Sequence, residues 1–212
     1  MSIPAGAGGP IKAVIFDIGG ILEPPFDHVL FPELARMLGV PEPGLRARRK
    51  ADAPALTEGR MTLRDFYARV AGESASPVDP GAALARHLAV YAAATAELDQ
   101  RVLGLIQELR RRYVVGCLTN TEVEVGQFNR DRGLYRPFDR AFLSTELGVG
   151  KPDQAVFRRV LADLRCAPHE VVFTDDNPVN TEGAKTAGMP AIHYRDFESF
   201  LRDLARAVER GA

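Results

Sequence analysis

The residues whose chemistry stands out in this chain are Asp17, the pair Thr119-Asn120, Lys151 and the pair Asp175-Asp176. Three of these groups follow, or end, an apolar run typical of a buried strand: residues 13–16, 114–118 and 171–174. Because the carboxyl ends of parallel strands lie along one edge of a sheet, we expect these side chains to meet there. A carboxylate, a hydroxyl, a lysine and an acid pair at one place are suited to phosphoryl chemistry.

Taken singly, most of these residues also have a plainer explanation. Asp17 precedes Gly19-Gly20, whose glycines allow a sharp turn, so it could be a nucleophile, a metal ligand or a turn residue. Thr119-Asn120 could bind a phosphate oxygen or simply end a strand. Lys151 precedes Pro152, which suits the first position of a helix, and could equally be a surface lysine.

The adjacent acids Asp175 and Asp176 are the sharpest signal. Two neighbouring carboxylates after an apolar strand repel one another unless a cation or a strong donor is present. Asn180, four residues beyond Asp176, could return to the same place from the first turn of a helix. Oxygen ligands of this kind suit Mg²⁺, which prefers carboxylates, waters and substrate phosphate.

The elements that must position these residues alternate along the chain. Strand and helix patterns follow one another in residues 11–22 and again in residues 97–212, which predicts an α/β fold with a doubly wound parallel sheet. Residues 23–96 show no strand pattern. Pro41, Pro43, Pro54, Pro77 and Pro80 break this stretch into about four helices, so we expect an all-helical cap inserted after the first strand.

Composition narrows the function further. The chain has 212 residues, of which 46% are hydrophobic, enough for one substantial core with an insertion. Its formal net charge is -1, which indicates no nucleic-acid or membrane partner. Two cysteines, Cys117 and Cys166, suggest a reduced cytoplasmic protein. We expect no membrane span, and a flexible lead-in over residues 1–10. Oligomeric state cannot be inferred from these features.

Four motifs in order make the chain resemble the haloacid dehalogenase-like (HAD) hydrolases. They are residues 14–22 (VIFDIGGIL), 118–121 (LTNT), 150–152 (GKP) and 173–180 (FTDDNPVN), and the helical insertion resembles the family's C1-type cap. The resemblance runs from residue 11 onward. Within the superfamily it is closest to small phosphatases that act on sugar phosphates and related monoesters.

The resemblance implies a role for each candidate residue. Asp17 would attack phosphorus and form an aspartyl-phosphate. Mg²⁺ would be held by the Asp17 carboxylate, the Gly19 backbone carbonyl and Asp176. Asp175 and Asn180 would support the metal site. The phosphoryl group would be held by four residues: Thr119, the backbone of Asn120, Lys151 and Gly20. The expected partner is a small phosphorylated molecule.

One position departs from the family pattern. Phosphatases of this family usually carry a second Asp two residues after the nucleophile, as a general acid and base, and here that position is Gly19. Such a group typically contributes about 10²–10⁴-fold. Its absence leaves three possibilities open: a preference for good leaving groups, replacement by Glu23, Asp27 or His28, or vestigial activity.

Two other functions therefore remain alternatives to a phosphatase. Haloacid dehalogenases also lack the second Asp, but the pair Asp175-Asp176 favours a bound Mg²⁺, which dehalogenation does not require. A catalytically impaired, metabolite-binding protein of the same fold is the other alternative. Substrate choice would lie in the cap, where the candidates to face the site are Phe26, His28, Arg60, Tyr67 and residues 46–50.

Overall fold

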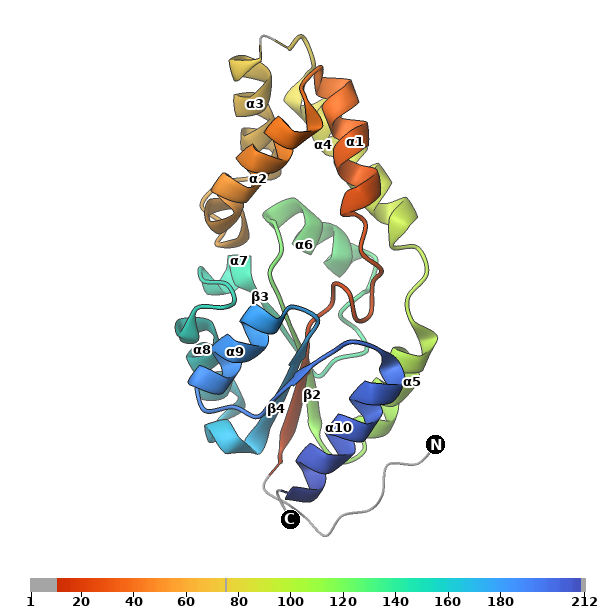
Figure 1. Cartoon of the computed structure of the whole chain (residues 1–212), viewed down its shortest axis with the longest axis vertical. Helices are drawn as coiled ribbons and strands as arrows, with labels where there is room; N and C mark the ends of the chain where they lie inside the picture. The colour runs from red at the N-terminus through yellow and green to blue at the C-terminus, as the bar shows by residue number, and fades with distance from the viewer. Residues whose placement is uncertain (1–10, 75, 211–212) are drawn as a thin grey trace.

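A computed structural model describes residues 11–74 and 76–210, so the lead-in expected over residues 1–10 lies outside the described part. Its centre is a five-stranded parallel sheet with helices on both faces, and a group of helices stands beyond one end of the sheet (Figure 1). The strands are β1 (Ala13–Phe16), β2 (Val114–Thr119), β3 (Arg140–Leu143), β4 (Val171–Asp175) and β5 (Ala191–His193). They lie in the order β3-β2-β1-β4-β5. The predicted α/β fold class is confirmed.

The central strands bury both faces, which explains why they are continuous apolar runs. In β1, Val14 and Phe16 pack on one face of the sheet, and Ala13 and Ile15 pack on the other. All four side chains are fully buried. The same two-residue alternation holds in β2 and β4, so the sheet separates two hydrophobic cores.

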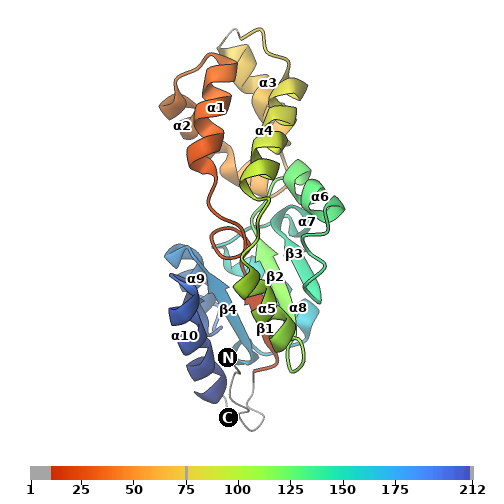
Figure 2. The same cartoon turned by 90° about the vertical axis from the view of Figure 1, so that its right-hand side faces the viewer.

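Seven helical segments surround the sheet in the described part of residues 97–212. They are α5 (Gln100–Leu109), α6 (Val123–Asp131), α7 (Ser144–Leu147), α8 (Gln154–Leu164), η1 (Pro168–Glu170), α9 (Pro178–Thr186) and α10 (Phe197–Arg210). Helices α5 and α10 share a core with Val14 and Phe16. Helices α8 and α9 lie on the opposite face (Figure 2). The helices thus form a layer on each side of the sheet.

The remaining helices form the expected insertion between β1 and α5. Its described residues contain α1 (Asp27–Leu38), α2 (Glu42–Thr57), α3 (Leu63–Glu73) and α4 (Pro80–Ala94), which share a hydrophobic core that also includes Val125 of α6. We call these four helices the cap. Helix α3 begins at a capping box, in which Thr62 and Asp65 satisfy each other's backbone N–H groups, as its sequence predicts.

One expected helix break in the cap is wrong. Pro54 lies inside α2, which continues to Thr57. Proline lacks a backbone N–H donor, and its ring crowds the preceding turn of a helix. When the proline lies close to the end of the helix, both effects are confined to that end. Pro54 falls in the last turn of α2, so the helix loses little and ends only three residues later.

The order of the strands creates the place where a ligand site is expected. From β1 the chain goes to β2 and β3 on one side, and later to β4 and β5 on the other, so the winding reverses beside β1. Phe16 is in register with Cys117 and Thr174. Asp17, Thr119 and Asp175 therefore end adjacent strands at nearly the same level, on the edge that faces the cap (Figure 1).

Candidate active site

Asp17 leaves β1 directly into a tight turn. Its backbone N–H donates to the Thr174 carbonyl at 2.8 Å, which continues the pairing with β4. Its Oδ1 accepts from the Ile18 N–H at 2.7 Å, which orients the carboxylate. The turn closes where the Gly20 N–H donates to the Glu23 carbonyl at 2.8 Å, with Gly20 at φ +69°. A glycine is required there because this backbone conformation is strained for other residues.

Lys151 lies between two carboxylates at the centre of the site. Its Nζ is 2.9 Å from Asp17 Oδ1 and 2.6 Å from Asp175 Oδ2, and its side chain is 1% exposed. Burial alone would lower the pKa of Lys151, but the charges and hydrogen bonds of Asp17 and Asp175 raise it overall. The lysine is therefore a fixed positive charge. The simple surface-lysine explanation is excluded by this burial.

Burial dominates the electrostatics of Asp17. It raises the pKa of the carboxyl to about 7, with Lys151 opposing the shift and Asp175 adding to it. The positive charge of Lys151 offsets only part of the cost of removing the Asp17 carboxylate from water. A second cation nearby would therefore stabilise the charged form of Asp17. A divalent cation beside Asp17 would supply that second charge.

Asp175 is fully buried and its two oxygens are fully used. Oδ1 accepts from the Asn177 N–H at 2.9 Å and from Asn180 Nδ2 at 3.0 Å. Oδ2 accepts from Lys151 Nζ at 2.6 Å. Asn180 thus returns to the site from the first turn of α9, as expected. Asp175 therefore fixes Lys151 and the start of α9.

Asp176 is the exposed member of the acid pair and depends on Gly20 for its position. A Cβ built on Gly20 would overlap the Asp176 carboxylate, so the absence of a side chain at residue 20 is what admits that carboxylate. His193, which sequence reasoning missed, donates from Nε2 to the Asp176 carbonyl at 3.0 Å. The expected contact between Gly20 and substrate stays a prediction.

The residues present fit a divalent cation. Oxygens of Asp17, Asp175 and Asp176 lie within 4.8 Å of one another, with one oxygen taken from each. Hard oxygen donors in a small cluster match the preference of Mg²⁺. The space that Gly20 leaves for Asp176 is a second sign of fit. Asp17 and Asp176 would hold the ion directly, together with the Gly19 carbonyl, and Asp175 and Asn180 would support it.

The segment after β2 is held by side-chain hydrogen bonds that its sequence does not predict. Thr119 ends the strand and is 8% exposed. The Asn120 side chain makes two hydrogen bonds with the backbone of Lys151. Asn120 Nδ2 donates to the Lys151 carbonyl at 2.8 Å, and the Lys151 N–H donates to Asn120 Oδ1 at 2.9 Å. The family resemblance predicts that Asn120 acts through its backbone. The structure adds a use for its side chain, which aligns the second and third motifs.

Position 19 is open, and Glu23, one of the expected replacements for the missing acid, is occupied elsewhere. A Cβ on Gly19 would meet nothing within 4 Å. Glu23 is 5% exposed, accepts from the Tyr91 hydroxyl at 2.7 Å and pairs with Arg132. Asn129 also donates to that hydroxyl, at 2.7 Å. Glu23 is thus part of a buried network between the cap connection and α6, and it is not available as the missing proton donor.

Two glutamates at the start of α6 join the cap to the sheet edge. Glu122 pairs with Arg49 of α2, and both side chains are largely buried. Glu124 accepts from the backbone N–H groups of Leu63 and Arg64, each at 3.1 Å, at the beginning of α3. A carboxylate at a helix N-terminus is favourable because free N–H groups and the helix dipole meet there. The cap is therefore closed over the segment that follows Thr119.

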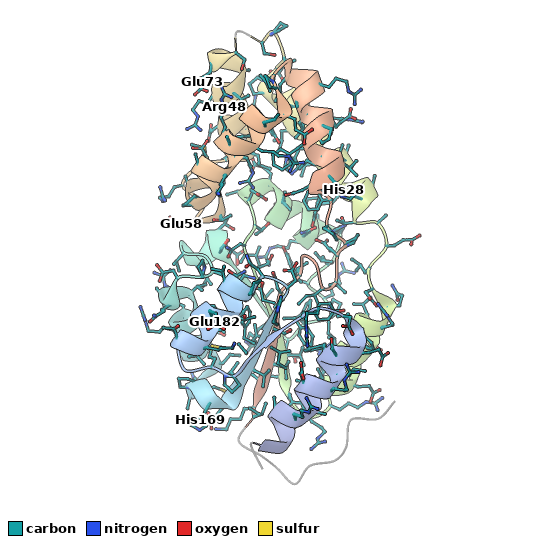
Figure 3. The ribbon with its side chains drawn as sticks, in the orientation of Figure 1. His28, Arg48, Glu58, Glu73, His169 and Glu182 are labelled. Carbon is teal, nitrogen blue, oxygen red and sulfur yellow. The ribbon has the colours of Figure 1, made fainter. Side chains whose placement is uncertain are left out.

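The residues of the cap that were expected to face the site lie in different places. Phe26, Arg46, Arg49 and Lys50 line a cavity where the cap meets the core. Tyr67 is buried inside the cap, against His87, and Arg60 pairs with Glu58 at the surface. Arg48 points away and bonds Glu73 at 2.8 Å (Figure 3). His28 lies exposed at the end of α1 nearest the core (Figure 3).

The described part of the chain holds no helix with the length and apolar character that a membrane span needs.

The chain belongs to the haloacid dehalogenase-like hydrolases, since the pattern of that family matches residues 11–188. This finding agrees with the motifs and with the sheet order. It establishes the family and leaves the reaction and the substrate open.

Several curated relatives are phosphatases by name. A sesquiterpene phosphatase of Aspergillus oryzae is 24% identical over 93% of this chain and 96% of its own length. A D-ribitol-5-phosphate phosphatase of Bacteroides thetaiotaomicron is 25% identical over 92% of this chain and 97% of its own length. Other relatives are longer. The chain spans 25% of an Aspergillus calidoustus drimenol cyclase, at 30% identity over 59% of the chain, and 39% of a Sus scrofa bifunctional epoxide hydrolase 2.

Solved structures share the fold. A HAD-family enzyme of Bacteroides thetaiotaomicron superposes with a TM-score of 0.72 at 21% identity, covering 91% of this chain and 98% of that one. That enzyme has also been solved in complex with magnesium and inorganic phosphate. A 2-haloacid dehalogenase of Pseudomonas syringae gives a TM-score of 0.68 at 23% identity, covering 95% and 100%. This chain therefore shares its fold with both proteins.

Proposed function

We propose that this hydrolase is a Mg²⁺-dependent phosphatase of small phosphorylated metabolites, acting through an aspartyl-phosphate on Asp17. The observation that carries the proposal is the arrangement Asp17–Lys151–Asp175 with Asp176 beside it. The lysine ammonium is fixed between two carboxylates, and the second acid is left to bind a cation. A nucleophile, an anion-binding charge and a metal ligand are thus held within one hydrogen-bond network.

The chain's own residues would divide the work as follows. The free oxygen of Asp17 attacks phosphorus while its Oδ1 stays bonded to Ile18 and Lys151. Lys151, the Thr119 hydroxyl and the Asn120 N–H bind the phosphoryl oxygens and stabilise the charge that develops on them. Mg²⁺, when bound, neutralises charge on the phosphoryl group and orients it toward Asp17. The closed cap excludes water until the aspartyl-phosphate has formed.

The phosphatase names among the relatives support this proposal, and the likeness to a dehalogenase concerns the fold alone. The structure favours a phosphatase because Asp175 and Asp176, together with Asp17, form a cluster that could hold a cation. Dehalogenation needs a nucleophilic carboxylate but no metal, and Asp176 together with the space left by Gly20 would then have no use.

Phosphate release in the presence of Mg²⁺, and again with EDTA, tests the proposal. The panel should contain p-nitrophenyl phosphate, acetyl phosphate and several sugar 1- and 6-phosphates. Asp17→Asn should abolish turnover and leave the fold intact by circular dichroism. The matched control is Glu182→Gln, an exposed acid on α9 that pairs only with Lys185 in the described part and should hydrolyse at the unmodified rate.

The alternatives give different results in the same assay. Halide release from 2-haloacids without metal would replace the phosphatase by a dehalogenase. Turnover that survives in Asp17→Asn would remove the aspartyl-phosphate. If the unmodified protein is silent and Gly19→Asp gains activity, the protein is a binding member of the family that has lost proton transfer.

A further inference from the structure

The turn that follows Asp17 is held by the backbone of Glu23. The Glu23 N–H donates to the Ile18 carbonyl at 3.1 Å, and the Glu23 carbonyl accepts from the Gly20 N–H at 2.8 Å. Ile18 in turn donates its own N–H to Asp17 Oδ1 at 2.7 Å. A shift of Glu23 would therefore move the N–H group that orients the Asp17 carboxylate.

The same turn carries the expected metal contacts. Gly19, whose carbonyl is an expected metal ligand, lies between the two residues that Glu23 bonds, and it is itself bridged to Glu23 by strand-like pairing. Gly20 leaves the space that admits the Asp176 carboxylate. The position of Glu23 therefore affects the metal ligands as well as the nucleophile.

The side chain of Glu23 is fixed by partners from outside the turn. Its buried carboxylate accepts from the Tyr91 hydroxyl at 2.7 Å and pairs with the guanidinium of Arg132, the C-cap residue of α6. Arg132 also donates to the hydroxyl of Thr95 at 2.9 Å and to its carbonyl at 3.2 Å. Thr95 is the C-cap residue of α4, where the chain leaves the cap. Arg132 therefore joins the turn to the end of the cap.

Both connections between cap and core thus meet at one guanidinium. They are residues 23–26 and 95–99, and they lie on the same side of the molecule (Figure 1). Removing two charges from water often costs more than their attraction returns, so an apolar contact of the same size would stabilise the fold about as well. Hydrogen bonds between charged groups are directional, however, and so they also fix the geometry of the groups that they join.

We propose that Arg132 and Glu23 are positioning residues, whose ion pair holds residues 18–20 so that Asp17 and the metal ligands are aligned. The inference rests on the proposed phosphatase function and adds two residues that touch neither substrate nor metal. Lys151 is positioned independently, through Asn120 and Asp175. Loss of the pair should therefore change kcat and metal affinity, and KM much less.

Arg132→Gln tests the proposal through Mg²⁺ binding and steady-state kinetics. Without the guanidinium, the Glu23 carboxylate loses its charged partner and the turn loses its link to α6. We expect the Kd for Mg²⁺, measured by isothermal titration calorimetry, to rise at least ten-fold. At saturating Mg²⁺, kcat for p-nitrophenyl phosphate should fall at least ten-fold, since a misplacement of about 1 Å at a reacting centre can cost about 10²-fold. KM should change less than three-fold.

Glu23→Gln tests the same pair from its other side and keeps the size of the side chain. It should reproduce the changes in Kd and kcat, and it carries the test if Arg132→Gln does not fold. The double variant should be no worse than either single variant, because the two side chains act as one unit. Arg132→Lys keeps a positive charge beside Glu23, so its Kd and kcat should stay within three-fold of the unmodified values.

Two control variants separate positioning from a general loss of stability. Arg130→Gln is the matched control on α6, because this exposed neighbour pairs with Glu146 at the surface and should leave Kd and kcat unchanged. Tyr67→Phe removes a buried hydrogen bond to His87 inside the cap. It should lower the free energy of unfolding in urea, as the pair variants do, and leave Kd and kcat unchanged.

The outcomes also separate this inference from the proposed function. If Kd and kcat stay unchanged in Arg132→Gln and Glu23→Gln, the pair serves stability alone and the positioning role is overturned. The role is equally overturned if Tyr67→Phe causes the same losses, or if the losses add in the double variant. In these outcomes the unmodified protein still binds Mg²⁺ and releases phosphate, so the proposed function stands. An unmodified protein that does neither overturns both.

Discussion

The side chain of Asn120 and the backbone of Lys151 exchange two hydrogen bonds, of 2.8 and 2.9 Å, across a gap of 31 residues in sequence. This pairing couples the end of β2 to the loop that carries the buried ammonium. Gly150 fits against it, since a Cβ there would come within 2.9 Å of Asn120 Oδ1. The position of Lys151 between Asp17 and Asp175 is thus set from both its backbone and its side chain.

Removing the Asn120 amide should therefore lower kcat more than it raises KM. In Asn120→Ala the Lys151 backbone loses both partners, and a misplacement of about 1 Å at a reacting centre can cost about 10²-fold. Steady-state kinetics with p-nitrophenyl phosphate measure the split. Gln127→Ala is the control, because that exposed side chain bonds only Asp131 on α6 among the described residues. A change in KM alone would mean that the Asn120 side chain serves substrate binding and does not position Lys151 for the reaction.

Gly20 should govern metal affinity through Asp176. In Gly20→Ala the new Cβ would overlap the Asp176 carboxylate, and φ at this position is +69°, which costs a residue with a side chain about 1 kcal/mol. We expect the Kd for Mg²⁺, measured by isothermal titration calorimetry, to rise at least ten-fold. Gly104→Ala on α5 is the control, since its Cβ would meet nothing within 4 Å. Unchanged Mg²⁺ affinity in Gly20→Ala would remove Asp176 from the metal site.

The sequence predicts the sheet and the convergence of its polar residues because both depend on strong local signals. Apolar runs of four to six residues mark the central strands, and parallel strands must end at a common edge. The capping box at Thr62 is equally local. These features need no knowledge of which distant residues are neighbours.

What the sequence does not reveal are contacts that depend on three-dimensional neighbours. Asn120 looks like an ordinary residue at the end of a strand, and no residue close to it in sequence indicates that Lys151 is its partner. His193 lies on the edge strand β5, where only the strand order brings it to Asp176. Pro54 is predicted to break a helix because composition alone does not show how close a helix is to its natural end. Long-range packing decides all three.

The buried network around Tyr91 should make a measurable contribution to stability. Tyr91 donates to Glu23 at 2.7 Å and accepts from Asn129, and Arg132 bonds both Glu23 and the Thr95 hydroxyl. Tyr91→Phe leaves the buried carboxylate without its phenol donor, at a cost of about 1–3 kcal/mol in the free energy of unfolding. Urea unfolding measures this loss.

A double-mutant cycle tests whether that cost belongs to the pair. In a Glu23→Gln background, Tyr91→Phe should cost less, because the group left without its donor is then uncharged. Equal costs in both backgrounds would mean that the Tyr91 hydroxyl stabilises the protein through Asn129 and Arg132, and not through Glu23.

His87 should make the protein lose stability in mild acid. Its Nδ1 lies 2.6 Å from the Tyr67 hydroxyl inside the cap, where burial, with the Arg49 charge adding to it, lowers the pKa of His87 from 6.5 to about 3. Burial raises the pKa of Tyr67, so the phenol remains the donor and the imidazole the acceptor. The folded protein therefore binds fewer protons than the unfolded chain between these two pKa values, and its stability falls as pH decreases from 6.5 toward 3.

At pH 5 this one group should lower the free energy of unfolding by about 2 kcal/mol relative to pH 8, from 1.4 kcal/mol for each pH unit below 6.5. Urea unfolding of the unmodified protein and of His87→Gln at both pH values isolates the contribution, because glutamine does not titrate. His169→Gln is the control, since this exposed residue lies at the opposite end of the molecule from the cap (Figure 3). If His87→Gln shows the same difference between pH 8 and pH 5 as the unmodified protein, His87 is protonated in the folded state and does not set the acid sensitivity of the cap.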